Sequence, residues 1–403
     1  MKVVHINTND SGGGAAIACS RHCAAMNTMG HESVMIVARK QTDFRYVRKY
    51  TGVFSFYILN RLLNRVITWY VQRLNAIGKF SYFFPGINFM GCTDIKDADV
   101  IVVHWINNGI MSLSGLESIL KLGKPTYWYM HDMFPITGGC HHSLGCAGFM
   151  SSCSDCKIVQ NRNIYNFADF QLRQKIRCLS KYDNLIFGAP SVWLTELSRK
   201  SALAKKHTVV NIPNVIDTKL YKPTESTKNK YGLDGSKYTI LIGNASIQSP
   251  YKGMQYAYDL LKALNPDKYE ALIIGGSLNP IELGIKINVI SVGFVSDEKK
   301  MIEIYNACDL FVITSVAENY PNVVLEAMAC GKPCVGFPTG GIPDLIKHKI
   351  TGYLTKKYNA QSLIEGVEWC VQDCNYSNLS NNARRQIVIE NDFTKVMKLY
   401  GLS

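Results

Sequence analysis

The sequence lacks the features that mark secreted and membrane-spanning chains. It contains no uninterrupted apolar run of about eighteen residues, the length that a membrane-spanning helix needs. Its first residues, MKVVHINT, have the pattern of a buried strand and not the charged head, apolar run and small-residue cleavage site of a signal peptide. We therefore expect a cytoplasmic protein without a transmembrane helix.

The cysteines do not have the pattern of a disulfide-bonded protein. The 13 cysteines are an odd number, and many stand singly inside apolar runs, as Cys308, Cys330 and Cys334 do. Buried single cysteines of this kind behave as small apolar residues and stay reduced in the cytoplasm. The cysteine pattern therefore indicates the same compartment.

Acidic residues are fewer than basic ones, and the difference is concentrated in one segment of the chain. The chain has 31 acidic and 44 basic residues, a formal charge of +13, and the segment 39–79 alone holds nine basic residues against Asp43. A basic surface this confined argues against a nucleic-acid partner. Residues 53–74 mix arginines with aromatic and aliphatic residues, which indicates a helix lying on an anionic membrane surface. A helix packed on the first sheet with its arginines in water explains the pattern nearly as well.

Apolar content is high at 47%, and 403 residues suffice for two domains. Short apolar runs alternate with helical patterns, which is typical of parallel βαβ units and predicts two doubly wound α/β domains with a ligand crevice at their strand ends. The expected strands cover residues 2–7, 30–38, 98–105, 125–132, 184–191, 238–244, 269–276, 287–294, 308–315 and 333–338. A Pro-, Lys- and Thr-rich connection at 212–230 is the predicted linker, giving domains 1–215 and 216–385.

The stretch ENYPNVVLE carries two glutamates, Glu318 and Glu326, around a predicted helix start. If Pro321 is the first helical residue and Tyr320 the cap, the amides of the next two residues point out of the helix end. Those residues are Asn322 and Val323. Such an end binds anions and suits a diphosphate, with a carboxylate on either side. Two glutamates at this spacing would by themselves be interpreted as ordinary solvated residues. The order in which the segments follow one another, a strand, a loop with Glu318, a helix that begins with proline, GKP, a second strand and GGIPD, is a more specific sign of a binding site.

That order resembles the nucleotide-sugar motif of the large retaining glycosyltransferase family with the GT-B fold, known as group 1 or family 4. Glu318 and Glu326 are separated by seven residues and followed by AMACGKPCVGFPTGGIPDLI. Four further segments are similar to the family: the glycine turn and helix at 9–37, HDMFPITGGCHHS at 131–143, NVIDTKLYKP at 214–223 and NDFTKVMKLYGL at 391–402. The resemblance implies two Rossmann-like domains facing across a cleft, with residues 386–403 returning to the first domain.

The resemblance also implies an activity. Members transfer a hexose from a nucleotide sugar to a glycan or lipid-linked acceptor, here in bacterial capsule, exopolysaccharide or O-antigen synthesis, with UDP favoured and GDP possible. Glu318 would contact the donor sugar and Glu326 the ribose, and Lys252 would stabilise the departing diphosphate, a transition-state effect. His131 would contact the donor sugar. A surface lysine in the turn SPYKG is the alternative for Lys252.

Backbone contacts come from other positions. Gly275, Phe294 and Val295 match the segments that hold the base. Gly13 and Gly14 stand in a turn without GxGxxG spacing, which serves either the donor phosphates or acceptor, or simply a tight turn. Asn244 occupies the place where family members often have an arginine, so the second phosphate-binding cation is left open.

Four cysteines, Cys140, Cys146, Cys153 and Cys156, fall within one loop that ends in a CxxC pattern. Four thiolates in a cytoplasmic chain predict a closed structural zinc site, with His141 and His142 as alternative ligands. Reduced cysteines in an ordinary loop are the competing interpretation. No catalytic metal is expected.

Two other functions share these observations. A sugar-nucleotide epimerase could use the same architecture, and a non-catalytic factor of polysaccharide assembly could bind the membrane without transferring sugar. For the transferase we expect a nucleotide sugar, a glycan or lipid-linked acceptor and an anionic membrane surface as partners. The expected location is the cytoplasm or, peripherally, the cytoplasmic face of the inner membrane.

Overall fold

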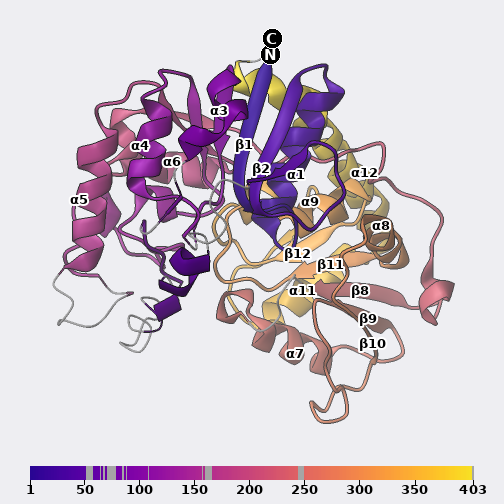
Figure 1. Cartoon of the computed structure of the whole chain (residues 1–403). Coiled ribbons are helices and arrows are strands. Elements are labelled where there is room, and N and C mark those ends of the chain that lie inside the picture. Colours follow the sequence, from indigo (N-terminus) through magenta and orange to yellow (C-terminus); the bar gives the residue numbers. More distant parts are fainter. Residues whose placement is uncertain are drawn as a thin grey trace. The chain divides into compact units, whose positions relative to one another are not determined.

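The computed structural model divides the chain into two compact units, each built on a parallel sheet (Figure 1). It describes residues 1–50, 58–63, 65–66, 69, 79–83, 86–87, 89–107, 109–156, 158, 166–243 and 249–401. Unit 1 comprises Met1–Pro213 with Met397–Ser403, and unit 2 comprises Asn214–Val396. The predicted fold class, α/β with two doubly wound domains, is confirmed.

The sheet of unit 1 has seven parallel strands in the order β3-β2-β1-β4-β5-β6-β7. The strands are β1 (Lys2–Asn9), β2 (Glu32–Arg39), β3 (Val47–Lys49), β4 (Val100–Val103), β5 (Thr126–Tyr129), β6 (Leu185–Ala189) and β7 (Thr208–Asn211). The order reverses at β1, which lies between β2 and β4. Ligands bind at the carboxyl ends of strands beside such a reversal.

Helices cover this sheet because its strands are apolar on both faces, and α1 lies against β1 and β2 (Figure 1). The helices are α1 (Gly14–Thr28), α3 (Thr93–Asp97), α4 (Leu113–Leu120), α5 (Phe167–Leu179) and α6 (Val192–Lys200). Serines start two of them: Ser112 Oγ accepts from the Gly115 amide at α4, and Ser191 Oγ from the Leu194 amide at α6, which satisfies amides that the helix leaves unpaired.

The sheet of unit 2 has six parallel strands in the order β10-β9-β8-β11-β12-β13. They are β8 (Tyr238–Gly243), β9 (Tyr269–Ile274), β10 (Asn288–Gly293), β11 (Leu310–Ile313), β12 (Cys334–Gly336) and β13 (Gly352–Leu354). The helices of this unit are α7 (Met254–Ala263), α8 (Glu298–Ala307), α9 (Asn322–Ala329), α10 (Ile342–Leu345), α11 (Ala360–Cys370), α12 (Asp373–Glu390) and α13 (Phe393–Val396). Here the order reverses at β8.

The ends of the two units differ from the predicted ones. The first junction lies at Pro213, two residues before the predicted boundary, and the return to unit 1 begins at Met397 and not at residue 386. Helix α12 stays with unit 2 because it is tied to α9: Ser380 Oγ donates to the Gly331 carbonyl at 2.6 Å and Arg384 Nη1 to the Ala329 carbonyl at 2.7 Å.

The segment 53–74 is described only in part. Residues 58–63, 65–66 and 69 are helical, and the others of this segment lie outside the described residues. Within the part of the chain that the structure describes, no helix is both long enough and apolar enough to cross a membrane.

Candidate active site

Three loops of unit 2 are tied together where β8, β11 and β12 end. The Val316 amide donates to the Tyr251 carbonyl at 2.8 Å, and Thr314 Oγ1 donates to the Lys252 carbonyl at 2.8 Å. Thr339 Oγ1 donates to the Val316 carbonyl at 3.0 Å, which joins the third loop to the other two. Parallel strands end at one edge of a sheet, so these bonds build a single surface from three distant segments.

This surface brings together two of the predicted residues. Lys252 Nζ lies 2.7 Å from Glu318 Oε2, and their side chains are 23% and 16% exposed. The pair is therefore shielded from water on most sides, where a charge–charge contact is stronger than on an open surface. An ammonium group and a carboxylate thus stand side by side at the strand ends.

Two glycines allow the loops to approach closely. Gly253 has φ +61°, and a Cβ there would lie 2.1 Å from the Thr314 carbonyl oxygen. Gly340 has φ +55°, and a Cβ there would lie 1.7 Å from the carbonyl oxygen of Glu318. Both positions need glycine for conformation and for space. They were not singled out from the sequence, although Gly253 follows the predicted lysine and Gly340 stands in the motif GGIPD.

The start of α9 differs by one residue from the prediction. Pro321 is the N-cap and not the first helical residue, because its ψ of 118° is extended; the helix begins at Asn322. The Pro321 carbonyl accepts from the amides of Val324 at 3.1 Å and Leu325 at 3.3 Å. The amides of Asn322 and Val323 belong to the first turn of this helix, as predicted.

Glu326 lies one turn further along α9, and its carboxylate is fixed by a hydrogen bond from Tyr305. Its side chain is 5% exposed, and Oε2 accepts from the Tyr305 hydroxyl at 2.8 Å. Burial and the nearby Glu326 raise the pKa of Tyr305 well above its ordinary value, so the hydroxyl remains a donor. Tyr305, like Gly253 and Gly340, was not singled out from the sequence.

The predicted base-binding positions stand at the ends of β9 and β10. The Gly275 amide donates to the Gly293 carbonyl at 2.8 Å, and both glycines have positive φ. Phe294 is 63% exposed and Val295 partly buried. Asn244, at the end of β8, lies outside the described residues.

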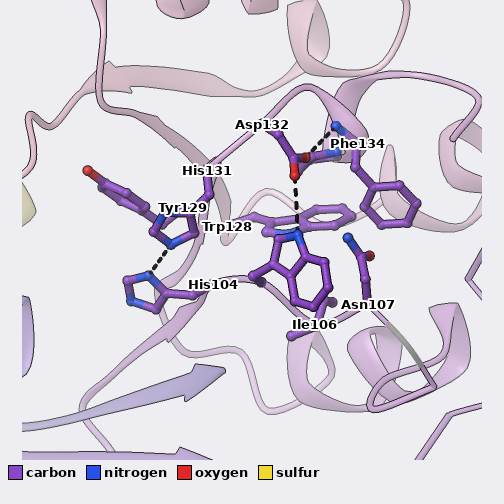
Figure 2. Close-up of a pocket in the computed structure, with 10 residues that line it drawn as sticks. His104, Ile106, Asn107, Trp128, Tyr129, His131, Asp132 and Phe134 are labelled. Atoms are coloured by element: carbon purple, nitrogen blue, oxygen red, sulfur yellow. Dashed lines mark hydrogen bonds between the residues drawn. The ribbon is translucent and has the colours of Figure 1, made fainter. Parts of the chain in front are cut away.

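In unit 1, the predicted His131 lies two residues after β5 and lines a small pocket (Figure 2). The pocket is lined by His104, Trp105, Ile106, Asn107, Trp128, Tyr129, His131, Asp132, Phe134 and Pro135. Asp132 accepts from Trp105 Nε1 at 3.2 Å. It also accepts from the Phe134 amide at 2.9 Å, as Figure 2 shows. The carboxylate thereby fixes the loop that follows His131.

Asp132 also contacts His141, and that contact extends to Ser81. His141 Nδ1 lies 2.5 Å from Asp132 Oδ2, and Ser81 Oγ lies 2.7 Å from His141 Nε2. Burial alone would raise the pKa of Asp132, but the charge and hydrogen bond of His141 outweigh it and hold that pKa low. Serine, histidine and aspartate follow the order of a hydrolase triad. Ser81 is only 7% exposed, so the group holds the loop together and offers no accessible nucleophile.

The glycine turn precedes α1. Gly13 is the N-cap and Gly14 the first residue of the helix. A Cβ at Gly13 would meet no atom within 4 Å. Packing within the turn therefore does not demand glycine at this position.

Two groups of residues in unit 1 could hold a metal ion: the predicted cysteine loop and a cluster of two histidines and a cysteine. Cys140, Cys146, Cys153 and Cys156 are partly exposed free thiols, and the Gly148 amide donates to Cys146 Sγ at 3.4 Å. Among the described residues, the metal-ligating atoms that lie within 4.8 Å of one another as a group of three belong to His5, Cys19 and His104 instead. That group was not predicted.

The chain is similar to known glycosyltransferases. The sequence model of the family Glycosyl transferases group 1 matches residues 224–386, inside unit 2. An uncharacterized glycosyltransferase of Methanocaldococcus jannaschii is 28% identical over 174 residues, 41% of this chain and 44% of that one. A putative colanic acid biosynthesis glycosyl transferase of Escherichia coli, WcaC, is 24% identical over 66% of this chain and 68% of its own. The chain spans 44% of the Methanocaldococcus relative and 52% of a further relative, the N-acetyl-alpha-D-glucosaminyl L-malate synthase of Bacillus anthracis (25% identical over 48% of this chain), about half the length of each.

Solved structures share the whole architecture. HepE of Anabaena, crystallised with UDP and glucose, superimposes with a TM-score of 0.66 at 18% identity, covering 100% of this chain and 98% of that one. At such identity the likeness concerns the fold alone, which is the two-domain GT-B fold. Residues 224–386 belong to the glycosyl transferases of group 1, and the chain as a whole has the GT-B architecture.

Proposed function

We propose that the protein is a retaining glycosyltransferase that moves a hexose-type sugar from a nucleotide sugar to a glycan or lipid-linked oligosaccharide of a bacterial surface polysaccharide. The observation that carries the proposal is the contact between Lys252 and Glu318 beside the first turn of α9. UDP is favoured as the nucleotide because HepE, which shares the fold, was crystallised with UDP and glucose. The similarity to WcaC supports a polysaccharide product.

The proposed reaction uses these groups as follows. The diphosphate binds the amides of Asn322 and Val323, and Lys252 turns from Glu318 to the diphosphate as charge develops on it. Glu318 supports positive charge at the anomeric carbon. The bond from that carbon to the phosphate oxygen breaks, a bond to the acceptor hydroxyl forms on the same face, and the acceptor proton passes to the departing phosphate. Glu326 binds the ribose hydroxyls and His131 the donor sugar.

Replacing either member of the pair tests this. The preferred donor is first found by screening UDP- and GDP-sugars for transfer or slow hydrolysis. Glu318→Gln and Lys252→Met should each lower the turnover of that donor by about a hundredfold or more. The surface pair Lys230 and Glu303 of the same unit, 3.0 Å apart and 54% and 43% exposed, provides matched controls. Lys230→Met and Glu303→Gln should leave turnover unchanged. Wild-type turnover in folded Glu318→Gln would overturn the proposal, and an isomerised sugar as product would indicate the epimerase.

We also propose that the protein binds the cytoplasmic face of the inner membrane through its basic helical segment. Six apolar side chains of that segment are 44–60% exposed: Ile58, Leu59, Leu62, Leu63, Val66 and Trp69. Exposure on this scale favours the membrane interpretation over a helix packed on the sheet. Basic residues beside them suit anionic lipid and thus a lipid-linked acceptor.

A structural zinc ion in the cysteine loop is proposed as well. Cys140, Cys153 and Cys156 pack against one small apolar cluster, and the Gly148 amide bonded to Cys146 is the kind of donor that supports a metal-bound thiolate. Elemental analysis should find one zinc per chain, lost in Cys153→Ser/Cys156→Ser and kept in Cys374→Ser, an exposed cysteine of unit 2. A metal-free wild-type protein would refute the site.

A further inference from the structure

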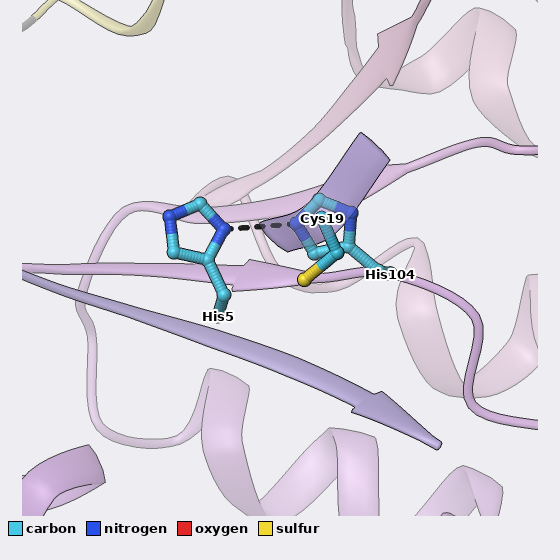
Figure 3. A group of neighbouring side chains, drawn as sticks. All are labelled: His5, Cys19 and His104. Atoms are coloured by element: carbon cyan, nitrogen blue, oxygen red, sulfur yellow. Dashed lines mark hydrogen bonds between the residues drawn. The ribbon is translucent and has the colours of Figure 1, made fainter. Parts of the chain in front are cut away.

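Three histidines from neighbouring strands form a continuous chain inside unit 1. His5 lies in β1, His104 directly follows β4 and His131 follows β5. His5 Nδ1 is 2.9 Å from His104 Nε2 (Figure 3), and His104 Nδ1 is 2.9 Å from His131 Nε2 (Figure 2). His5 is fully buried and His104 is 2% exposed. The chain therefore runs from the pocket into the core.

All three rings are neutral at physiological pH. Burial lowers the pKa of His5 to about 3 and that of His131 to about 4, and burial with the neighbouring histidines lowers the pKa of His104 well below its ordinary value. A neutral imidazole carries one N–H donor and one nitrogen acceptor. Each ring must therefore donate on one side and accept on the other.

The inner end of the chain sets its direction. His5 Nε2 lies 3.3 Å from Met26 Sδ. A thioether accepts a hydrogen bond weakly and has no proton to donate. The proton of His5 is thus on Nε2, and its Nδ1 accepts from His104 Nε2–H. His104 Nδ1 in turn accepts from His131 Nε2–H, which leaves Nδ1 of His131 without a proton.

We propose that His5, His104 and Met26 are positioning residues that hold His131 as the Nε2–H tautomer, so that its Nδ1 accepts a hydrogen bond from a sugar hydroxyl. The partner of Nδ1 must be a donor: a hydroxyl meets this condition and a phosphate oxygen does not. The inference rests on the proposed function, in which His131 contacts the donor sugar. It assigns that contact its direction and its chemical class.

The same chain does not conduct protons. A relay needs a group at its far end that can take up or release a proton, and Met26 can do neither. Its effect is to orient: it fixes which nitrogen of His131 carries hydrogen and which way the ring lies. An imidazole in the wrong tautomer loses its function even where geometry is intact.

Cys19 gives the cluster a second chemical option. Its thiol lies with His5 and His104 in the group whose ligand atoms are all within 4.8 Å (Figure 3). A neutral imidazole has one lone-pair nitrogen. In His5 and in His104 this nitrogen is Nδ1, and it already accepts a hydrogen bond from the next histidine. A bound ion would take these lone pairs and break the chain, so metal binding here is a result that would overturn the proposal.

Nitrogen-15 NMR of the full chain with labelled histidine tests the tautomer directly, without any sugar present. At pH 7 the three rings should be protonated at Nε2 and bare at Nδ1. Met26→Leu removes the acceptor, so a measurable fraction of His131 should change to the Nδ1–H form. Met35→Leu, the same change at another fully buried methionine of unit 1, should leave the signals unaltered. His131 protonated at Nδ1 in the wild type, an unchanged Met26→Leu spectrum, or stoichiometric metal that stays bound in Cys153→Ser/Cys156→Ser would each overturn the inference.

A kinetic measurement separates positioning from mere stability. His104→Phe removes the acceptor for His131 and should lower kcat for transfer by about tenfold to a hundredfold, since misplacing a contact group costs this order. Its KM for the nucleotide sugar should change little, because unit 2 is proposed to hold the nucleotide. An unchanged kcat in the folded variant would refute the role of His104. Failure of the proposed function alone would leave the NMR result intact while no sugar is transferred.

Discussion

At the scale of single residues, the contact between Lys252 and Glu318 is the central finding. The sequence allowed each to be proposed separately, through its resemblance to a family motif. It could not predict that they meet at 2.7 Å, because they lie 66 residues apart and follow different strands. The contact depends on Gly253 and Gly340, whose backbone angles and close approaches appear only once the loops are folded.

Pro321 shows how far local rules reach. Proline suits both the N-cap and the first helical position, because neither needs an amide hydrogen bond within the helix. The sequence therefore located the start of α9 to within one residue. The ψ angle of Pro321, extended at 118°, decided between the two positions.

The histidine chain shows where residue-level prediction stops. His131 was selected because it stands in a recognisable loop after a strand. His5 and His104 stand inside apolar runs that were correctly predicted as buried strands, and a buried strand by itself gives no sign that one of its members is polar for a reason. Only the order of the strands, with β1 next to β4 and β4 next to β5, brings the three rings together.

At the scale of elements, periodicity predicted the sheets well. Each of the ten predicted strand segments overlaps an observed strand, and the strands follow in the predicted order along the chain. The short strands β3, β7 and β13 were not predicted. They have three or four residues each, too few for an apolar run to stand out.

The exposed helical segment gives a prediction at this scale. Leu59, Leu62 and Leu63 are 44–51% exposed, so replacing all three by serine removes apolar surface without opening the core. Inserting a leucine side chain into an apolar environment is worth about 1.5–3 kcal/mol. The triple variant should therefore bind vesicles of anionic phospholipid at least about tenfold more weakly in a sedimentation assay.

Controls for this experiment come from unit 2 and from salt. Ile281, Ile350 and Ile389 are 89%, 57% and 47% exposed, and their triple serine variant should bind vesicles like the wild type. Binding to anionic vesicles should weaken as salt is raised, since arginine attraction is screened. Equal binding by both triple variants would show that this segment is not the membrane contact.

At the scale of the whole molecule, the two units differ in the groups they bury. Among the described residues, six histidines of unit 1 have lowered pKa values. Four of them, His5, His22, His104 and His131, lie together, with the rings of the other three in contact with that of His104. The buried carboxylate and tyrosine around α9, Glu326 and Tyr305, belong to unit 2. The units should consequently respond differently to acid.

The sign follows from linkage. The folded pKa of each of these histidines lies below the unfolded value of 6.5, so between the two values the unfolded chain binds more protons than the folded one. Their contribution to stability is complete above pH 6.5 and is lost as the pH falls towards the folded values, about 4 for His131 and about 3 for His5. Four such groups together weaken unit 1 by about 5 kcal/mol for each pH unit below 6.5.

Since a domain is stable by only about 5–15 kcal/mol, unit 1 should unfold between about pH 5 and pH 4 while unit 2 remains folded. Hydrogen exchange read by mass spectrometry distinguishes the two units, once it is corrected for the intrinsic pH dependence of exchange. Peptides from β1, β4 and β5 report on unit 1, and peptides from β8, β9 and β11 report on unit 2. Protection in the first set should be lost first as the pH falls, and a urea titration at pH 7.5 supplies the reference order in which histidine charging has no part. If both sets lose protection together, or unit 2 opens first, the buried histidines do not govern the acid stability of the molecule.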